Sequence, residues 1–224
     1  MPKRFSAGMK AVLVAGILAL GACAQATTTG TPQDGAMTNA SSKNPLARFK
    51  MRWDHHERSD RWNQSAVNAL RTHGSALPDF VPEDIEAWCP GYTTASREER
   101  EAFWVGLISA LAKHESTWNP KAVGGSGSWF GLVQISPRTA QGYNCRATSG
   151  AELTSGADNV SCAIRIMSHT VQRDGVVSRG MRGVAADWGP FHSASKREDM
   201  SAWTRAQPFC QPKGKGRMAA LRGG

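Results

Sequence analysis

The sequence lacks a long uninterrupted apolar run. The stretch Ala11–Leu20 is about 10 residues long, whereas a membrane-spanning helix needs about 20. Three cationic residues and no acidic residue precede this stretch, and two small residues follow it. This arrangement is typical of a secretory signal peptide. We therefore assign residues 1–22 to a signal peptide and expect an exported protein.

A cysteine follows the expected signal peptide. The tetrapeptide Leu20-Gly21-Ala22-Cys23 is similar to a bacterial lipobox, in which the cysteine becomes the lipidated first residue. Acyl chains on Cys23 would anchor the protein to a membrane, each buried methylene contributing about 0.8 kcal/mol. We expect a lipid-anchored protein on the periplasmic face of the cell envelope, and Ala24 in place of Asp favours the outer membrane. An ordinary signal peptide followed by a chance cysteine is the alternative.

Acidic residues are scarce relative to basic ones. The chain has 18 Asp and Glu against 27 Lys and Arg, a formal net charge of +9. Removal of residues 1–22 takes away three cations, which leaves 24 against 18, or +6. A positive surface suits an anionic lipid or an anionic cell-wall polymer. Nucleic acid is not expected as a partner of an exported protein. The alternative is that the excess charge serves solubility alone.

Motifs that bind metals or nucleotides are absent. From His56 the sequence is "HERSD", with Asp60 where the metalloprotease motif His-Glu-x-x-His has its second histidine. The glycine-rich stretch 124–131 is not followed by the Lys-Ser or Lys-Thr of a phosphate-binding loop. We expect neither a metal nor a cofactor.

Closely spaced cysteines are also absent, which argues against a zinc knuckle. Apart from Cys23 the chain has four cysteines, at positions 89, 145, 162 and 210. An even number in an exported protein predicts two disulfides. Four cysteines allow three pairings, and their spacing alone leaves all three open.

Composition divides the exported chain into an ordered centre between two polar ends. Residues 24–45 have almost no large apolar side chain, which predicts a flexible tether, and we assign 23–48 to the lipidated cysteine and this tether. Residues 49–88 are expected to form a helical extension, with Asp60 capping a helix that ends before Gly74. Residues 211–224 are expected to be a flexible basic tail.

A longer helix is predicted to begin near Arg97. Ser96 and Glu99 are three residues apart, the spacing of a capping box. The residues that follow place apolar side chains at helical spacing along one face: Trp104, Leu107, Ile108 and Leu111.

The apolar face of this helix ends on an acidic residue. At about 100° per residue, Glu115 lies within about 20° of Ile108 around the helix, in a last turn that Pro120 prevents from extending far. Burial and the negative end of the helix dipole would both raise the pKa of its carboxyl. A general acid needs such a raised pKa, because it must hold a proton near neutral pH. A structural glutamate, paired with an arginine or with backbone donors, is the alternative.

Two segments lie close together in the sequence: "ESTWNPKA", which starts at Glu115, and "GLVQISPRTA", which starts at Gly131. Together they resemble the linked motifs of the lytic transglycosylase family, the SLT-type branch of the lysozyme superfamily. The resemblance implies a mainly α, lysozyme-like α+β fold over residues 89–210, with a short irregular or β-like glycine-rich segment. It also implies that Glu115 is the catalytic acid and base, with Ser116, Gln134 and Ile135 beside it in the sugar groove.

A third family motif, Ala-Tyr-Asn-Ala-Gly, falls on residues 185–190, where the tyrosine is missing. Trp188 is either a sugar-facing aromatic surface in its place or a core residue. Before this motif the family has a helix, which Asp158 would cap and Gly175 would end.

Placed on the family's fold, the cysteines favour one of the three pairings. One disulfide would join Cys145 to Cys162 across a short loop before the helix, and the other would join Cys89 to Cys210 at the ends of the domain.

The expected reaction is cleavage of the glycosidic bond between N-acetylmuramic acid and N-acetylglucosamine in peptidoglycan. Such cleavage commonly uses two carboxylates, yet only Glu115 has motif support. We expect Glu115 to protonate the leaving oxygen and then to take the proton of the muramic C6 hydroxyl, giving a 1,6-anhydromuramyl product. A hydrolase on the same scaffold and a non-catalytic peptidoglycan-binding lipoprotein are the alternatives.

Overall fold

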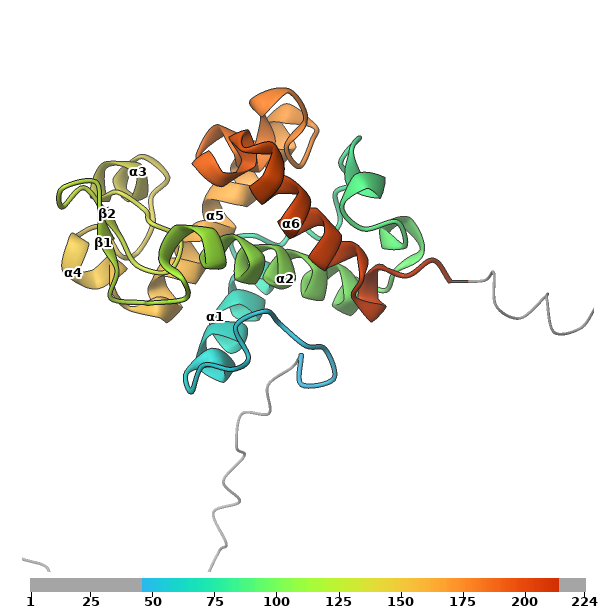
Figure 1. The fold of residues 1–224 in the computed structure, drawn as a ribbon, viewed down its shortest axis with the longest axis horizontal. Coiled ribbons are helices and arrows are strands. Elements are labelled where there is room, and N and C mark those ends of the chain that lie inside the picture. The colour runs from blue at the N-terminus through green and yellow to red at the C-terminus, as the bar shows by residue number, and fades with distance from the viewer. Residues whose placement is uncertain (1–45, 214–224) are drawn as a thin grey trace, which may run out of the picture. The chain divides into compact units, whose positions relative to one another are not determined.

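The computed structural model describes residues 46–213. The expected signal peptide, Cys23, and most of the tether and tail lie outside these residues. The described elements are mainly helical: α1 (Ser59–Arg71), α2 (Arg97–Ser116), β1 (Val123–Gly124), β2 (Trp129–Phe130), α3 (Pro137–Gly142), α4 (Gly150–Leu153), α5 (Gly156–Asp174) and α6 (Ala194–Arg205) (Figure 1). The two strands form one antiparallel hairpin. No helix within residues 46–213 is long and apolar enough to cross a membrane.

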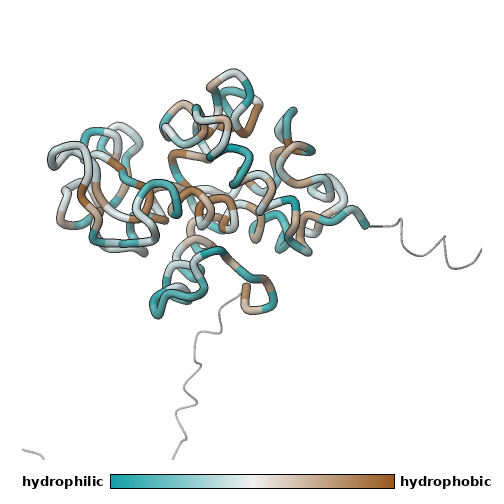
Figure 2. Tube along the Cα trace, viewed as in Figure 1, coloured by the Kyte–Doolittle hydropathy of each residue, from teal (hydrophilic) through white to brown (hydrophobic). Residues whose placement is uncertain are grey.

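Helix α2 runs through the centre of the fold (Figure 1). The predicted capping box is present, since the Ser96 side chain accepts from the Glu99 N–H and the Glu99 carboxylate accepts from the Ser96 N–H. Every residue from Glu101 to Ala112 is buried, so burial extends all round the helix rather than along a single stripe. In Figure 2 the trace through the centre of the fold carries many brown, hydrophobic residues. The predicted face is therefore buried, but so is the opposite face, because α1 and α6 both pack against α2.

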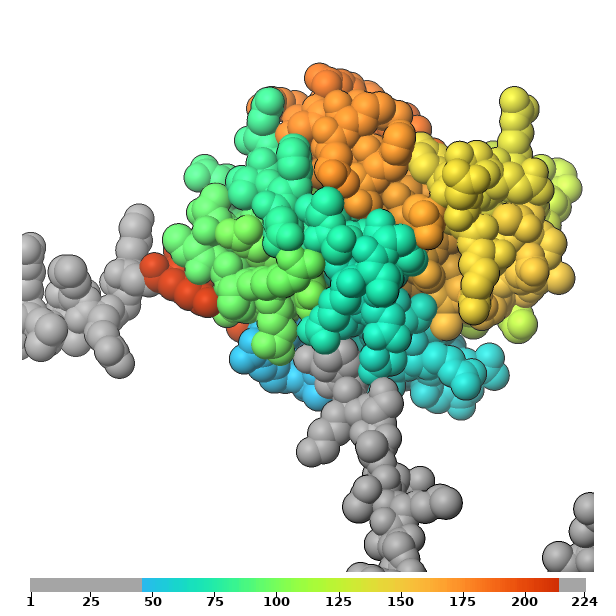
Figure 3. All heavy atoms as spheres, turned by 180° about the vertical axis from the view of Figure 1, so that it is seen from behind, coloured from blue at the N-terminus to red at the C-terminus, as the bar shows by residue number. Residues whose placement is uncertain are grey.

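Helix α1 shares the core of the domain that follows it. It packs lengthwise against α5 (Figure 3), and Trp62 and Leu70 are almost completely buried. Asp60 does not cap it as predicted, because α1 already begins at Ser59 and its N-cap residue Arg58 makes no side-chain cap. Leu46 is also fully buried, so the core begins before the boundary at residue 48 that composition predicts for the tether.

Two disulfides close the domain with the pairing that the family resemblance favours. Cys89 is joined to Cys210 and Cys145 to Cys162. In the chain-entropy model, loops of these lengths correspond to about 5 and about 3 kcal/mol of stabilisation.

The start of α5 and the beginning of the C-terminal tail differ from expectation. Helix α5 ends before Gly175 as predicted, but its N-cap is Ser155 rather than Asp158, which instead forms an ion pair with Arg146. Lys213, in the expected tail, forms an ion pair with Glu99.

Candidate active site

Glu115 lies in the last turn of α2 and faces a cavity of about 430 Å³. Helix α2 ends one residue later, where Thr117 adopts a left-handed conformation. The walls come from the β-hairpin, from the loop before α6 and from the first turn of α6. The lining side chains that matter for chemistry are Glu115, Trp129, Gln134, Asp187, Trp188 and Lys196.

The Glu115 carboxyl has no hydrogen-bond or ion-pair partner in the described part of the chain. The residue is half-buried, so it is less enclosed than its place on the apolar face predicts and can be reached from the cavity. Burial raises the pKa of its carboxyl to about 7, although the positive charge of Lys196 acts in the opposite direction. A carboxyl with this pKa can both hold and release a proton near neutral pH, as a general acid and base must.

Hydrogen bonds running in both directions join the two family motifs. The Ser116 hydroxyl donates to the Leu132 carbonyl at 2.7 Å. In return, the Gln134 side-chain amide donates to the carbonyls of Ala122 at 3.2 Å and Gly131 at 2.9 Å. Ser116 does not line the cavity. Its hydroxyl fixes the loop beside Glu115, and its expected contact with a sugar stays a prediction.

Gln134 does reach the cavity, through its carbonyl oxygen. Its amide nitrogen is used by the two backbone carbonyls, while Oε1 has no partner among the described residues and faces Gly124. A Cβ at Gly124 would lie 2.3 Å from this Oε1, so glycine allows the strand and the amide to approach each other. Gln134 is left with one free acceptor at the cavity wall.

Ile135 is a core residue and not part of the cavity that contains Glu115. Its side chain is 2% exposed, and its backbone N–H and carbonyl both bond to Phe130 at 3.0 Å. These bonds close the loop behind Gln134. Ile135 also lines a small adjoining hollow together with Gln134 and Trp188, and its expected contact with the substrate stays a prediction.

Asn159, on α5, fixes the same loop and was missed from the sequence. Its side chain is fully buried. Oδ1 accepts from the Val133 N–H at 3.0 Å, and Nδ2 donates to the carbonyls of Phe130 at 2.9 Å and Leu153 at 3.1 Å. A polar residue next to the apolar positions of a predicted helix was the available signal.

The exposed aromatic surface of the cavity belongs to Trp129 rather than Trp188. Trp188 is 3% exposed, and its Nε1–H donates to the Val133 carbonyl at 2.7 Å, so the core alternative describes it. Trp129 is 49% exposed. Its ring lies against Gly125, where a Cβ would come within 2.0 Å of the ring.

A second carboxyl, that of Asp187, borders the same cavity. Its Oδ2 accepts a hydrogen bond from the Tyr143 hydroxyl at 3.1 Å. Neighbouring protein atoms raise the pKa of the Asp187 carboxyl by desolvation, although the residue as a whole is exposed. Asp187 lies 72 residues after Glu115 in the sequence, so no local spacing indicated that the two side chains would line the same cavity.

Asp199 of α6 organises the positive charges around the end of α2. Its carboxylate binds both terminal nitrogens of Arg52, at 2.6 and 2.9 Å, as well as Lys113 at 3.0 Å and the Nε2–H of His114 at 2.7 Å. The Arg52 guanidinium, with help from the other two, holds the pKa of Asp199 well below its usual range. Lys196, one turn earlier on α6, takes no part in this cluster and leaves its ammonium group facing Glu115's cavity.

Within residues 46–213, no group of three or more His, Cys, Asp or Glu side chains is arranged to hold a metal ion.

Comparisons with known proteins indicate which family and fold the chain is similar to. Residues 93–183 match the family described as the transglycosylase SLT domain; the match contains both motifs and stops before Asp187. A search of curated proteins found no match to the chain.

Among solved structures, a glutamate-to-glutamine mutant of Bd0314 DslA superposes with a TM-score of 0.65 at 25% identity, covering 71% of this chain and 96% of that one. A second glutamate-to-glutamine mutant of DslA gives the same TM-score and identity, with 72% and 97% covered. The wild-type form has the same fold, with a TM-score of 0.62 at 23% identity and 72% and 98% covered. Residues 93–183 thus match the transglycosylase SLT domain, and the chain shares its mainly helical fold with these solved structures.

Proposed function

We propose that this protein cleaves the glycosidic bond between N-acetylmuramic acid and N-acetylglucosamine in peptidoglycan, with Glu115 as the catalytic acid and base. The observation that carries the proposal is the unpartnered, half-buried Glu115 carboxyl, whose pKa is raised to about 7, inside an SLT domain. A structural glutamate would be paired, as Glu101 is with Arg71.

One carboxyl group is enough for both proton transfers of this reaction. Protonated Glu115 gives its proton to the oxygen that leaves on N-acetylglucosamine as the C1–O bond breaks. The acetamido group of the muramic sugar stabilises the developing positive charge at C1, a substrate-assisted variant of glycoside cleavage. The resulting carboxylate takes the proton of the C6 hydroxyl while that oxygen bonds to C1. Glu115 is protonated again, no water is consumed, and the product has a 1,6-anhydromuramyl end.

Two cavity groups suit the sugar itself. The exposed ring of Trp129 offers a flat surface on which the apolar face of a sugar can stack, and Oε1 of Gln134 can accept from a hydroxyl or acetamido N–H. Both lie on the wall that Ser116 and Asn159 hold in place. The wall is thereby fixed before substrate arrives, which lowers the ordering cost of binding.

Digestion of purified sacculi tests the proposal. Wild type should lower their turbidity and release muropeptides, whereas Glu115→Gln should bind sacculi without solubilising them. Glu86→Gln, the same change at an exposed position outside the cavity, is the matched control and should remain active. Equal activity of Glu115→Gln and wild type would refute the assignment. Binding of wild type without release would support the non-catalytic alternative.

The Asp187 carboxyl favours a second candidate, hydrolysis on the same scaffold. A second carboxyl that borders the cavity of the acid is the arrangement by which glycosidases activate water. Digestion in ¹⁸O-labelled water separates the two reactions, since a hydrolase places the label on the new reducing end and a transglycosylase does not. The anhydro product is also lighter by one water, which mass spectrometry detects directly.

We also propose, from the sequence alone, that lipidated Cys23 holds the protein at the periplasmic face of the envelope, in the outer membrane. Labelled fatty acid should enter wild type and not Cys23→Ala. Membrane fractionation should place the labelled protein with outer-membrane markers, and recovery of wild type in the soluble periplasmic fraction would contradict the anchor.

A further inference from the structure

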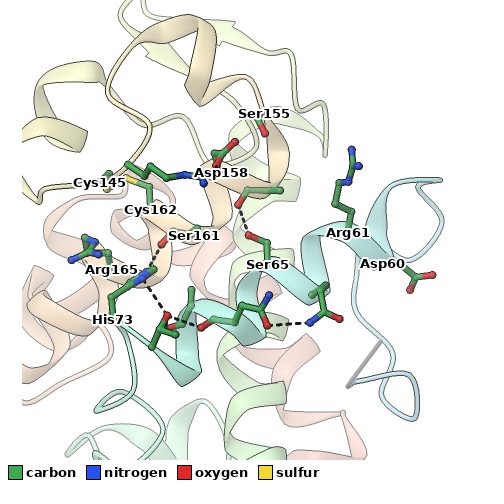
Figure 4. Close-up of a pocket in the computed structure, with 16 residues that line it drawn as sticks. Asp60, Arg61, Ser65, His73, Cys145, Ser155, Asp158, Ser161, Cys162 and Arg165 are labelled. Atoms are coloured by element: carbon green, nitrogen blue, oxygen red, sulfur yellow. Dashed lines mark hydrogen bonds and ion pairs between the residues drawn. A yellow bond between two sulfur atoms is a disulfide. The ribbon is translucent and has the colours of Figure 1, made fainter. Parts of the chain in front are cut away.

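A second and larger hollow lies between α1 and α5 (Figure 4). This α1–α5 groove is lined by side chains from residues 60–73 and 155–165, with Cys145 and Arg146 at its edge. Its volume is about 870 Å³, twice that of the cavity at Glu115, and the two share no lining residue. A volume of this size is typical of a ligand site.

Two arginines in the groove have no hydrogen-bond or ion-pair partner among residues 46–213. Arg146 is paired with Asp158 at 2.5 Å, and Asp60 is engaged as well. The guanidinium groups of Arg61 and Arg165, by contrast, form no hydrogen bond or ion pair within the described chain. Guanidinium groups bind carboxylates in a two-pronged geometry, so the groove offers two unused sites for carboxylates.

The two arginines lie toward opposite ends of the groove (Figure 4). Arg61 is near the start of α1, while Arg165 is close to His73, just after its end. Twelve residues separate positions 61 and 73, which corresponds to about 18 Å along a helix. Between these ends the α1 face carries neutral polar side chains, among them Gln64, whose Nε2 donates to Asn68 Oδ1 at 3.1 Å.

Short-range contacts hold the two walls together. The Ser65 hydroxyl donates to the Ala157 carbonyl at 2.6 Å. His73 Nε2 lies 3.0 Å from the Ser161 carbonyl, which can only accept, so this nitrogen carries the proton. At the base of the groove a Cβ on Gly156 would lie 2.3 Å from the Trp62 indole nitrogen. The groove is thus built by the fold and does not need a ligand to form.

The groove leads toward the catalytic cavity. His73 and Arg165 also border the next hollow, of about 560 Å³, which Tyr143 lines on its far side. The Tyr143 hydroxyl donates to Asp187, and Asp187 borders the cavity of Glu115. A five-residue peptide that spans the groove has no length left to cross this hollow as well.

We infer that the α1–α5 groove binds the acidic stem peptide of peptidoglycan in an extended form, with its carboxylates on Arg61 and Arg165. The inference rests on the proposed function for the identity of the polymer. An extended peptide spans at most about 3.3 to 3.6 Å per residue, so a stem of five residues reaches about 17 Å, the length of the α1 face. The groove therefore takes the stem of a neighbouring strand rather than that of the sugar at Glu115. The amides and hydroxyls between the arginines match the peptide groups between the carboxylates.

Calorimetric titration with a synthetic acidic stem tetrapeptide tests the inference without turnover. The double variant Arg61→Gln, Arg165→Gln should bind the peptide at least about tenfold more weakly than wild type, as expected for the loss of two charge-assisted contacts. Arg138→Gln, at an exposed position outside the groove, should bind as wild type does. The peptide with its carboxylates amidated should not bind wild type. Equal affinity of the double variant, or no binding by wild type, would overturn the inference.

Cleavage assays separate this inference from the proposed function. The double variant should retain wild-type kcat/KM on glycan strands stripped of peptides and lose efficiency only on peptide-bearing strands. An equal loss on both substrates would indicate general damage and contradict a peptide site. If wild type cleaves neither substrate, the proposed function fails, while the peptide titration still shows whether the groove binds the stem peptide.

Discussion

Replacing Glu115 with Gln should stabilise the protein more at pH 8 than at pH 5. Folding raises the pKa of this carboxyl from 4.5 to about 7, so its ionisation is harder in the folded chain than in the unfolded one. Because the folded pKa is raised, the stability that Glu115 contributes is fully present below pH 4.5 and is lost as the pH rises from 4.5 to about 7. The difference corresponds to about 3 kcal/mol once Glu115 is ionised in both states. Glutamine does not ionise and escapes this loss.

Urea unfolding of both proteins at the two pH values measures the effect. At pH 5 most of the loss has not yet occurred, so the gain of the variant over wild type should grow by about 2 kcal/mol between pH 5 and pH 8. Other titrating groups are common to both proteins and cancel in the comparison. A gain that is the same at both pH values would refute a raised pKa at Glu115, and with it the physical basis of the proposed acid.

Asp199 supplies an internal control of opposite sign. Its folded pKa is depressed by Arg52, Lys113 and His114, so its stability contribution is present at neutral pH and lost as the pH falls through the folded pKa. Asp199→Asn should therefore be less stable than wild type at pH 7, and the gap should close in acid. An assay that detects both signs in the same protein excludes a general effect of pH on unfolding.

Three further outcomes follow from the site. Activity on sacculi should fall as the pH rises through about 7, because Glu115 must be protonated to act as the acid. Lys196→Met should move the midpoint of this fall to a higher pH, because the ammonium group lowers the pKa of Glu115. An unchanged midpoint in the pH–rate profile would contradict this role of Lys196. Asn159→Leu should cost on the order of 2 to 4 kcal/mol in urea unfolding, since it leaves the Val133 N–H and the Leu153 carbonyl unpaired and removes one of the two hydrogen bonds to the Phe130 carbonyl. A loss below about 1 kcal/mol would show that the loop does not depend on Asn159. Trp129→Ala should raise KM for glycan strands severalfold with an unchanged melting temperature, because the ring is 49% exposed; an unchanged KM would remove it from the sugar site.

The parts of the fold predicted correctly are those decided by nearby residues. The start of α2 follows from a capping box that spans three residues, and Gly175 ends α5 through its own left-handed conformation. The start of α1 was misjudged because tertiary contacts decide it. Trp53, upstream of the helix, donates its Nε1–H to buried Asn63 at 2.8 Å, so packing of α1 on the preceding loop replaces the side-chain cap that was expected.

The same division holds at the site. Helical periodicity placed Glu115 beside the core, and its motif partner Gln134 lines the same cavity. Asp187 and Lys196 arrive from more than 70 residues away, and no short-range pattern can indicate that they meet Glu115. The choice between Trp129 and Trp188 depends on exposure, which the two tryptophans do not reveal by their position in the sequence.

The reciprocal bonds between the motifs give a physical reason for their short separation. Ser116 holds the loop by the Leu132 carbonyl, and Gln134 holds the chain that leaves α2 by the Ala122 carbonyl. Each bond restrains the segment that carries the other, so the end of α2 and the cavity wall move as one body. The unpartnered Glu115 carboxyl can then keep a fixed distance from the wall without any hydrogen bond of its own. A direct bond to the acid would stabilise one of its protonation states, and holding it through its neighbours leaves both states available for proton transfer.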